Sequence, residues 1–369
     1  MRVALNLMFL VPGETGGMEV YARELIPRLA ASPDLQVTAL VSRAAADADL
    51  GVETLVLPVD SRNRVDWVRG EQQHVPRAAK RIGAQIVHSL GSTAPLWGPF
   101  RRVTTIHDLN YKLVAESHFG VRGLGMRVLV PAAVRRSHRV IVDAASTRDD
   151  LREHLGTPAE KIDVVPLGVT PAPPVTPTAA SELRGRLGLG ERPVVLSVSA
   201  KRPHKNLARL LDAVAAIDPE RRPALVLPGY ATPHEAELRE RASALGLGGS
   251  VAFCGWLPAA DLEGLYALAD VFVFPSLYEG FGLPVLEAMA RGVPVATSAR
   301  GSLAEVAGDA AYVFDPTDVG AIRSAIERLL SDPAEAERLR AAGRARAATF
   351  SWDRTGELTI AGYVRALKV

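Results

Sequence analysis

Short apolar segments rich in β-branched residues recur along the first half of the chain, separated by longer polar or amphipathic stretches. Their length and composition are typical of buried strands. An alternation of such strands with helical stretches predicts an open parallel sheet. The segments cover residues 2–9, 36–42, 53–59, 84–90, 102–108, 138–144 and 161–167.

A second series of apolar segments follows residues 167–180, a stretch rich in proline and threonine that is typical of an extended linker. The pattern therefore predicts two doubly wound α/β domains with a cleft between them, residues 1–170 and 171–351. Beyond Asp318 the pattern becomes helical, and the last helix, about residues 352–369, is expected to cross back and pack on the first domain. The second series covers residues 192–199, 223–229, 250–256, 270–276, 293–298 and 310–315.

Two glutamates, Glu279 and Glu287, stand eight positions apart just after one of these strands. Gly280 and Gly282 between them favour a loop, and Pro284 fits the first turn of a helix, where its missing N–H costs nothing. We expect a helix from about Pro284 that ends before Gly292. Strand, glycine loop and helix together make an anion site, because free N–H groups at the helix start point toward a ligand.

Carboxylates that faced the phosphates of such a site would be repelled by them. Sugar hydroxyls are neutral donors that a carboxylate can accept from. The pattern around Glu279 and Glu287 therefore indicates a ligand that carries both phosphate and sugar, with one glutamate on each side of a diphosphate.

The composition is that of an ordinary globular protein, with 369 residues, 48% hydrophobic residues and a net charge of +2. This charge is too small to indicate a nucleic-acid partner. The single Cys254 excludes an intramolecular disulfide and a cysteine metal cage, which fits a reducing compartment. Residues 3–11 are read as the first strand rather than as a signal peptide, and no apolar run is long enough to cross a bilayer.

The stretch Glu279 to Glu287 resembles the E-x7-E motif of the family 4 retaining glycosyltransferases, which have the GT-B fold of two Rossmann-like domains facing a cleft. Other stretches are similar to further family signatures, in the family's order along nearly the whole chain. They are GGMEVYARELIPRLA from Gly16, TIHDL from Thr105, KIDVVPLGV from Lys161, SAKRPHKNL from Ser199, SLAEVAGDAAYVFDP from Ser302 and FSWDRT from Phe350.

The resemblance implies transfer of a hexose from a nucleotide-diphosphate sugar to a hydroxyl of a glycan or lipid-linked glycan, with the anomeric configuration retained. The first domain would be the acceptor side and the second the donor side, and neither a metal nor another cofactor is expected. TIHDL and SLYEGFGLPVLEAM resemble bacterial mannosyltransferases, so GDP-mannose is the first donor expected. UDP-glucose and related donors remain open.

Three residues of the second domain take catalytic or donor roles by this resemblance. Glu279 would bond a sugar hydroxyl and stabilise positive charge at the anomeric carbon. Glu287 would contact the donor ribose. Lys205 precedes a helix, where a lone lysine is unfavourable unless an anion is bound, and would clamp the leaving diphosphate. The amides of Gly280, Phe281, Gly282 and Leu283 would bind the same group.

The phosphate loop departs from the family at one position, because His204 stands where an arginine usually precedes the lysine. Arg202 or Lys201 would replace that arginine, or the loop is simply solvated; the sequence leaves these alternatives open. Ser199 would offer its backbone N–H to phosphate.

In the first domain, His107 ends a strand at the carboxyl edge where open α/β sheets bind ligands, and by resemblance it contacts the sugar. Asp108 would orient His107 or the backbone. Gly16 and Gly17 would allow close approach of the backbone to the diphosphate or acceptor, whereas Glu19 is expected to cap the helix.

Two further patterns carry weaker expectations. Asp47 to Asp49 matches a metal motif of another glycosyltransferase fold, but its polar surroundings predict no metal. Residues 121–139 mix arginines with apolar side chains and fit a contact to anionic lipid or to a lipid-linked acceptor; because Pro131 interrupts the stretch, an ordinary solvated helix face is favoured. The expected location is cytoplasmic, with weak contact to the inner membrane face as an option.

Other functions fit parts of the same pattern. A sugar-nucleotide epimerase or phosphorylase on this fold is the first alternative, and a sugar-nucleotide-binding relative without turnover is the second. A dinucleotide oxidoreductase is disfavoured, because neither domain opens with the Gly-x-Gly-x-x-Gly spacing.

Overall fold

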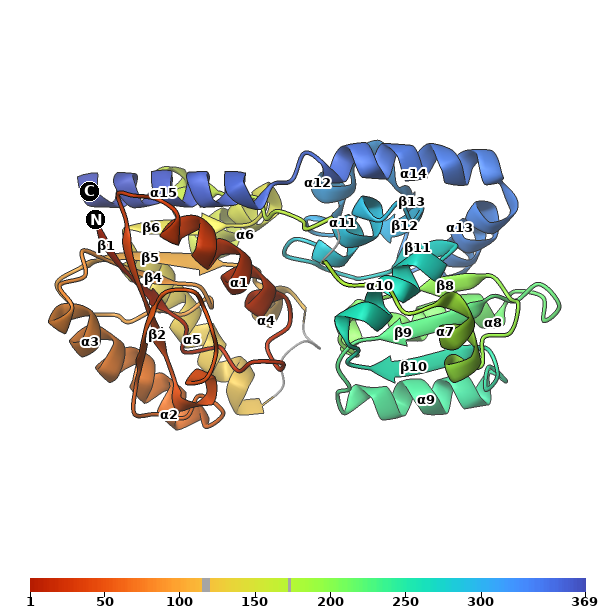
Figure 1. Ribbon diagram of the computed structural model, residues 1–369, viewed down its shortest axis with the longest axis horizontal. Helices are drawn as coiled ribbons and strands as arrows, with labels where there is room; N and C mark the ends of the chain where they lie inside the picture. Colours follow the sequence, from red (N-terminus) through yellow and green to blue (C-terminus); the bar gives the residue numbers. More distant parts are fainter. Residues whose placement is uncertain (115–119, 172–173) are drawn as a thin grey trace. The chain divides into compact units, whose positions relative to one another are not determined.

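A computed structural model describes residues 1–114, 120–171 and 174–369, with the side chains of 120–124 outside that description. The chain divides into two compact units, shown in Figure 1. Unit 1 comprises Met1–Gly168 together with Ser351–Val369, and unit 2 comprises Val169–Phe350.

Unit 1 is built on a parallel seven-stranded sheet in the order β3-β2-β1-β4-β5-β6-β7 among the described residues. The order reverses between β1 and β4, as in doubly wound folds. The strands are β1 (Arg2–Asn6), β2 (Gln36–Val41), β3 (Glu53–Val56), β4 (Ile86–Ser89), β5 (Arg101–Ile106), β6 (Arg139–Val142) and β7 (Ile162–Val164).

Helices cover both faces of this sheet because its central strands are apolar on both sides. In β6, Val140 and Val142 pack with the helix that carries Val130, whereas Ile141 faces Gly362 of the C-terminal helix. The helices of unit 1 are α1 (Gly17–Ala30), α2 (Arg64–Arg69), a π-helix (Gly70–His74), α3 (Val75–Arg81), α4 (Asn110–Leu113), α5 (Gly120–Arg136), α6 (Ala145–Leu155) and α15 (Trp352–Lys368), with short 3-10 turns at Arg43–Ala45 and Ala159–Lys161.

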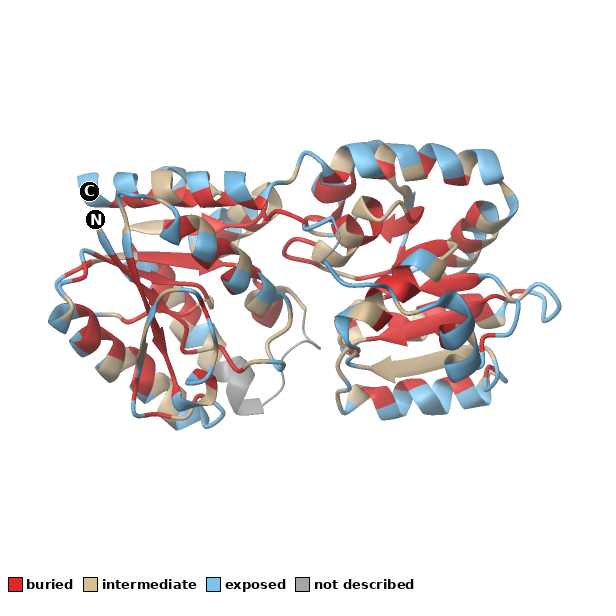
Figure 2. Cartoon of the chain, viewed as in Figure 1, coloured by how far each residue is buried: buried red, intermediate tan, exposed pale blue. Residues whose placement is uncertain are grey.

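Unit 2 has a parallel six-stranded sheet in the order β10-β9-β8-β11-β12-β13 among the described residues. Its order reverses between β8 and β11. Figure 2 shows its central strands as buried, with the edge strand β10 of intermediate exposure. The strands are β8 (Val194–Leu196), β9 (Ala224–Pro228), β10 (Val251–Gly255), β11 (Val271–Phe274), β12 (Val295–Ser298) and β13 (Tyr312–Phe314).

Amphipathic helices bury their apolar stripes against this second sheet. Leu210 and Leu211 of α8 join a core cluster with Val195 and Val271 of the strands. The helices of unit 2 are α7 (Ala180–Leu187), α8 (Leu207–Ala215), α9 (His234–Ala244), α10 (Ala259–Leu268), α11 (Leu283–Ala290), α12 (Leu303–Ala307), α13 (Val319–Ser331) and α14 (Pro333–Ala347), with 3-10 turns at Pro203–Lys205 and Gly308–Ala310.

The C-terminal helix α15 packs on unit 1, as predicted, and Figure 1 shows it beside α1. Ser351 caps its start by accepting from the N–H groups of the first turn. Thr355 Oγ1 donates to the carbonyl of Pro166 at 2.8 Å. A Cβ on Gly356 would lie 2.8 Å from Cβ of Arg28, so glycine is needed where α15 approaches α1.

Each predicted strand segment overlaps an observed strand, and the predicted doubly wound class is confirmed. One boundary differs in a way that affects the site. The sequence predicts a strand in the segment 102–108 with His107 at its end, but β5 ends at Ile106. His107 and Asp108 therefore lie in the loop that follows the carboxyl end of the strand.

Candidate functional site

The richest group of polar side chains in unit 2 lies where its strand order reverses. β8 and β11 are neighbours there, and from them the sheet continues in opposite directions, to β9 on one side and to β12 on the other. Such a point is where open α/β sheets bind ligands. Residues 197–206 follow β8 and lead into α8, and residues 275–282 follow β11 and lead into α11.

Lys205 and Glu279 meet across these two loops. Lys205 Nζ lies 2.6 Å from Glu279 Oε1, and the two side chains are only 17% and 10% exposed. The ammonium group also lies 5.3 Å from the ring centre of Phe274. Two predicted catalytic residues, 74 positions apart in sequence, are thus brought into direct contact.

Backbone contacts hold the two loops together around this pair. Asn206 adopts a left-handed conformation with φ of 59° and caps α8. Its side-chain amide donates to the carbonyl of Pro275 at 3.0 Å, and the N–H of Leu277 donates to the carbonyl of His204 at 2.8 Å. The position of Lys205 is therefore fixed by the loop that carries Glu279.

The glycine loop has the predicted form, because α11 begins at Leu283 with Pro284 in its first turn. Gly282 has φ of 105°, a conformation that favours glycine. A Cβ on Gly301 would lie 2.4 Å from the Glu279 carbonyl oxygen, and Ser302 Oγ donates to the carbonyl of Phe281 at 2.7 Å. Gly301 and Ser302, which the sequence analysis did not single out, hold this loop from the side.

Anion-binding groups converge on the same edge of the sheet. The N-termini of α8 and α11 both follow it, and each carries a partial positive charge. Three buried hydroxyls, those of Ser197, Ser199 and Ser276, have no hydrogen-bond partner among the described residues. The N–H of Ser199, which was predicted to bind phosphate, donates instead to the carbonyl of Pro228 at 3.1 Å.

Lys201, one of two residues predicted to replace the arginine of the phosphate loop, has a different role. Its side chain is fully buried, and Nζ donates to the carbonyls of Leu227 at 2.7 Å and Gly229 at 2.9 Å. Burial lowers its pKa to about 8. Because its ammonium group is used to tie the loop to β9, Arg202 is the remaining candidate for the second clamp, and its side chain is exposed.

Glu287 lies in the second turn of α11 and is partly buried. Tyr266 of α10 donates its hydroxyl to Glu287 Oε2 at 3.1 Å. Burial raises the pKa of the Glu287 carboxyl, while the charge of Arg291 and the bond from Tyr266 act in the opposite direction.

In unit 1, His107 is held by two hydrogen bonds. Nδ1 lies 2.6 Å from Asp143 Oδ2, and Nε2 lies 2.8 Å from the carbonyl oxygen of Leu90. Burial alone would lower the pKa of His107, but the charge and hydrogen bond of Asp143 outweigh it and raise the pKa to about 9. The ring is therefore an imidazolium at neutral pH that donates to both partners.

Asp143, which follows β6, is the residue that orients His107, and the sequence analysis did not identify it. Asp108 orients the backbone, the second of its two predicted roles, because it accepts from the N–H of Asn110 at 2.9 Å. The sequence does show that β5 and β6 are each followed by a polar residue, His107 and Asp143. Nothing in one sequence shows that these two ends are neighbours.

The glycine loop before α1 is partly as expected. Gly16 is the N-terminal cap of α1 with φ of 56°, so a side chain there would be strained. Gly17 is helical, and a Cβ there would meet nothing within 4 Å. Glu19 was predicted to cap the helix, but it accepts from the N–H of Gly13 at 2.8 Å, before the helix, and from Arg23; α1 has no side-chain cap hydrogen bond.

Replacing Asp143 with asparagine is expected to destabilise unit 1 most at low pH. The raised pKa of His107 contributes stability that is fully present below pH 6.5 and is lost as the pH rises through about 9. The expected loss for Asp143→Asn is about 3 kcal/mol at pH 6 and much less at pH 10. Urea unfolding at both pH values measures it, with the exposed Asp49→Asn as control; an equal loss at both pH values would contradict the ion pair.

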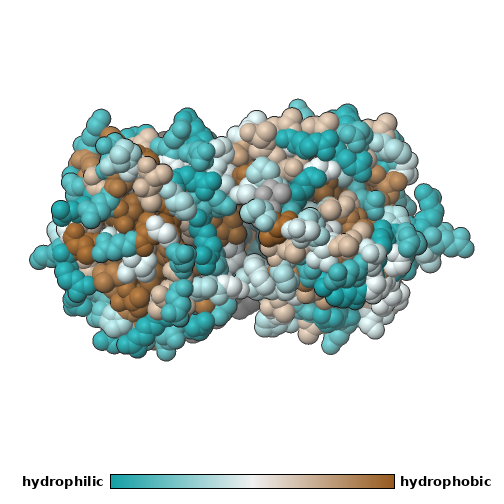
Figure 3. Space-filling model, in the orientation of Figure 1, coloured by the Kyte–Doolittle hydropathy of each residue, from teal (hydrophilic) through white to brown (hydrophobic). Residues whose placement is uncertain are grey.

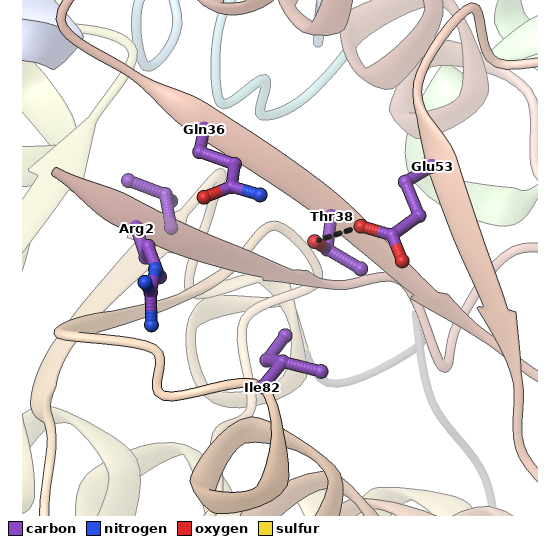
Figure 4. Close-up of a pocket in the computed structure, with 6 residues that line it drawn as sticks. Arg2, Gln36, Thr38, Glu53 and Ile82 are labelled. Atoms are coloured by element: carbon purple, nitrogen blue, oxygen red, sulfur yellow. Dashed lines mark hydrogen bonds between the residues drawn. The ribbon is translucent and has the colours of Figure 1, made fainter.

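Unit 1 also has a hollow away from the predicted site residues. A hollow of about 200 Å³ lies at the amino ends of β1 and β2, opposite the edge that carries His107. Figure 4 shows Arg2, Gln36 and Thr38 around it, with Thr38 bonded to Glu53. It lacks the catalytic side chains expected from the sequence.

The weaker expectations can be placed on the surface. Asp47 and Asp49 are exposed, and the His, Cys, Asp and Glu side chains of the described residues form no group of three or more suited to a metal ion. The lipid-contact prediction rests partly on residues 121–124, whose side chains lie outside the described residues. Pro131 does not interrupt that segment, since α5 continues through it.

Within the described ranges, no helix has both the length and the apolar character that a membrane span requires. Figure 3 shows apolar residues mixed with polar ones on the viewed face of each unit. The large apolar side chains that are exposed in unit 1 include Val65, Trp97 and Val128.

Comparison with known proteins covers both units. Residues 180–346 match the family model described as glycosyl transferases group 1, and residues 15–172 match the model described as Glycosyltransferase Family 4. The O-antigen chain mannosyltransferase B of Escherichia coli is 34% identical over 266 residues, which cover 71% of this chain and 70% of that protein.

A second relative is the GDP-mannose-dependent alpha-(1-6)-phosphatidylinositol monomannoside mannosyltransferase of Mycolicibacterium smegmatis, 33% identical over 289 residues that cover 73% of this chain and 74% of the relative. Among solved structures, Anabaena HepE in complex with UDP-glucose superposes with a TM-score of 0.78 at 21% identity. That superposition covers 99% of each chain.

Proposed function

Because this chain belongs to glycosyltransferase family 4, we propose that it transfers a hexose from a nucleotide-diphosphate sugar to a hydroxyl of a glycan or lipid-linked glycan. Its two doubly wound units have the GT-B fold predicted from the sequence. The observation that carries the proposal is the contact of Lys205 with Glu279 at the point where the strand order of unit 2 reverses.

The donor follows from the same site together with the relatives. The helix N-termini and the ammonium group of Lys205 suit a diphosphate, and Glu279 and Glu287 suit sugar hydroxyls. One relative is named for its dependence on GDP-mannose, both are mannosyltransferases, and HepE holds UDP-glucose. Mannose from GDP-mannose is therefore the first candidate, ahead of UDP-linked hexoses.

The proposed mechanism assigns opposite charges to the two ends of the bond that breaks. Lys205 and the amides of residues 280–283 stabilise the departing diphosphate, while Glu279 stabilises positive charge at the anomeric carbon. The bond from that carbon to the phosphate oxygen breaks, and a bond to the acceptor oxygen forms on the same face. The acceptor proton passes to the departing phosphate oxygen, so the configuration is retained without an enzyme nucleophile or a metal.

His107 remains the proposed sugar contact from unit 1. As an imidazolium it would have to exchange the Leu90 carbonyl for a sugar hydroxyl, because Asp143 occupies its other nitrogen. A binding relative without turnover is disfavoured by the intact Lys205 and Glu279 pair, and an epimerase or phosphorylase by the transferase names of both relatives.

A thermal-shift panel tests the donor class. The purified protein is heated with GDP, UDP, ADP and their common sugar conjugates, with EDTA present to remove metal. GDP and GDP-mannose are expected to raise Tm selectively, by the equivalent of about 2.7 kcal/mol at a hundred times Kd. NMR of the product formed from GDP-mannose and a mannoside acceptor then gives the anomeric configuration. An inverted product would refute the mechanism, and no shift with any nucleotide would refute the donor assignment.

A further inference from the structure

Tyr266 of α10 is a buried residue that touches the proposed ribose-binding glutamate. Only 2% of its surface is exposed, and its hydroxyl donates to Glu287 Oε2 at 3.1 Å. Its ring packs at 6.2 Å from the ring of Phe272 in β11. A tyrosine placed this way has no freedom to turn its hydroxyl elsewhere without leaving the core.

The Tyr266 ring also contacts a charged group. The guanidinium carbon of Arg291 lies 4.8 Å from the ring centre, a cation–π contact. Arg291 Nε donates to Glu263 Oε2 at 2.8 Å, and its NH1 group donates to the backbone carbonyl of Glu287 at 3.0 Å. The side chains of Arg291 and Glu263 are 12% and 9% exposed, so the pair is shielded from screening by salt.

We propose that Tyr266 is a positioning residue, which fixes the Glu287 carboxylate in one orientation toward the ribose hydroxyls of the donor. This rests on the proposed function, and it names a residue that acts through Glu287 rather than on the donor itself. Phe272, Arg291 and Glu263 fix Tyr266 in turn.

A tyrosine hydroxyl suits this task for a physical reason. It donates one hydrogen bond without neutralising the carboxylate, which keeps acceptor capacity for a sugar diol. Burial raises the pKa of Tyr266 well above its usual value, so the hydroxyl stays protonated and remains a donor. The groups that face Glu287 in unit 2 are Tyr266, Arg291 and Glu263; of these, Tyr266 and Arg291 lower the pKa of Glu287 and Glu263 raises it.

Removing the Tyr266 hydroxyl should therefore have two effects. Glu287 loses its fixed orientation, and its pKa, already raised by burial, rises further. Affinity for a ribonucleotide then falls at neutral pH, and the loss of affinity on acidification begins at a higher pH. For a nucleotide without ribose hydroxyls, neither the affinity nor its pH dependence should change.

The test compares GDP with 2′,3′-dideoxy-GDP by calorimetry on the whole chain, and UDP with 2′,3′-dideoxy-UDP if GDP does not bind. Tyr266→Phe is expected to weaken binding of the ribonucleotide about tenfold and of the dideoxy form less than twofold. The acidic limb of the affinity profile should move to higher pH. Tyr363→Phe is the matched control, because Tyr363 is a buried tyrosine of unit 1 that is hydrogen-bonded to His88 at 2.7 Å.

Each other outcome has a distinct meaning. If the wild-type chain binds none of GDP, UDP and ADP, the proposed function fails. If the wild type binds and Tyr266→Phe keeps its ribose preference and pH profile, the function stands and the positioning role is wrong. If Tyr266→Phe loses both nucleotide forms equally, with a fall in Tm like that of Tyr363→Phe, Tyr266 is a structural residue only.

Discussion

Lys205→Ala is expected to lower kcat by about a hundred- to a thousandfold, the usual cost of deleting one group that stabilises charge in a transition state. Lys205 is the basic side chain that contacts Glu279, and it stands at the end of the 3-10 turn just before α8. Without it, the negative charge on the departing diphosphate is met by neutral donors and helix dipoles alone. The KM for the donor should change less than kcat, since the charge grows as the bond breaks.

Steady-state kinetics with the donor selected by the thermal-shift panel measure this effect. Arg221→Ala is the matched control, because Arg221 is exposed on the loop that precedes β9, at the opposite edge of the sheet. Its kcat should equal that of the wild type. Lys205→Ala should keep a cooperative unfolding transition, although Glu279 loses its partner. A kcat within threefold of the wild type would remove Lys205 from the mechanism.

The parts of this protein that could be predicted are those set by short stretches of sequence. The strands could be predicted because parallel strands that are buried on both faces are continuous apolar runs. The start of α11 could be predicted because Gly282 favours a loop and Pro284 favours the first turn of a helix. The doubly wound class then followed from the alternation of strands and helices.

The residues that were missed are those whose role depends on distant neighbours. Asp143 orients His107 from 36 positions away, and Tyr266 reaches Glu287 from the preceding helix. Neither belongs to a local motif. They come together because β5 pairs with β6 and because α10 packs near β11, and single-sequence patterns do not encode such pairings directly.

Lys201 shows how charge alone misleads. In sequence it is one of two lysines in a short loop, and a lysine is almost never fully buried unless paired. The chain satisfies it with the carbonyls of Leu227 and Gly229, which lie at the carboxyl end of the neighbouring strand. A charged residue that seemed available to a phosphate is used to fix the loop on which Lys205 stands.

Glu279→Gln is expected to separate binding from catalysis. In the wild type a diphosphate has to share Lys205 with the glutamate that lies 2.6 Å away. Removing that negative charge should tighten binding of GDP by about tenfold, since a close like charge costs more than 1 kcal/mol in a partly buried site. Transfer should slow by about a hundredfold, because nothing then offsets positive charge at the anomeric carbon.

Calorimetry with GDP and steady-state kinetics with the sugar donor measure the two effects on one preparation. Glu220→Gln is the control. Glu220 is exposed and precedes β9, so this substitution removes the same charge from unit 2 far from the two loops. It should change neither quantity. If Glu279→Gln binds GDP more tightly but has a lower kcat, and the control shows neither change, then Glu279 stabilises the transition state and weakens binding of the product. Weaker binding of GDP with an unchanged kcat would instead make the Lys205 and Glu279 pair a structural contact.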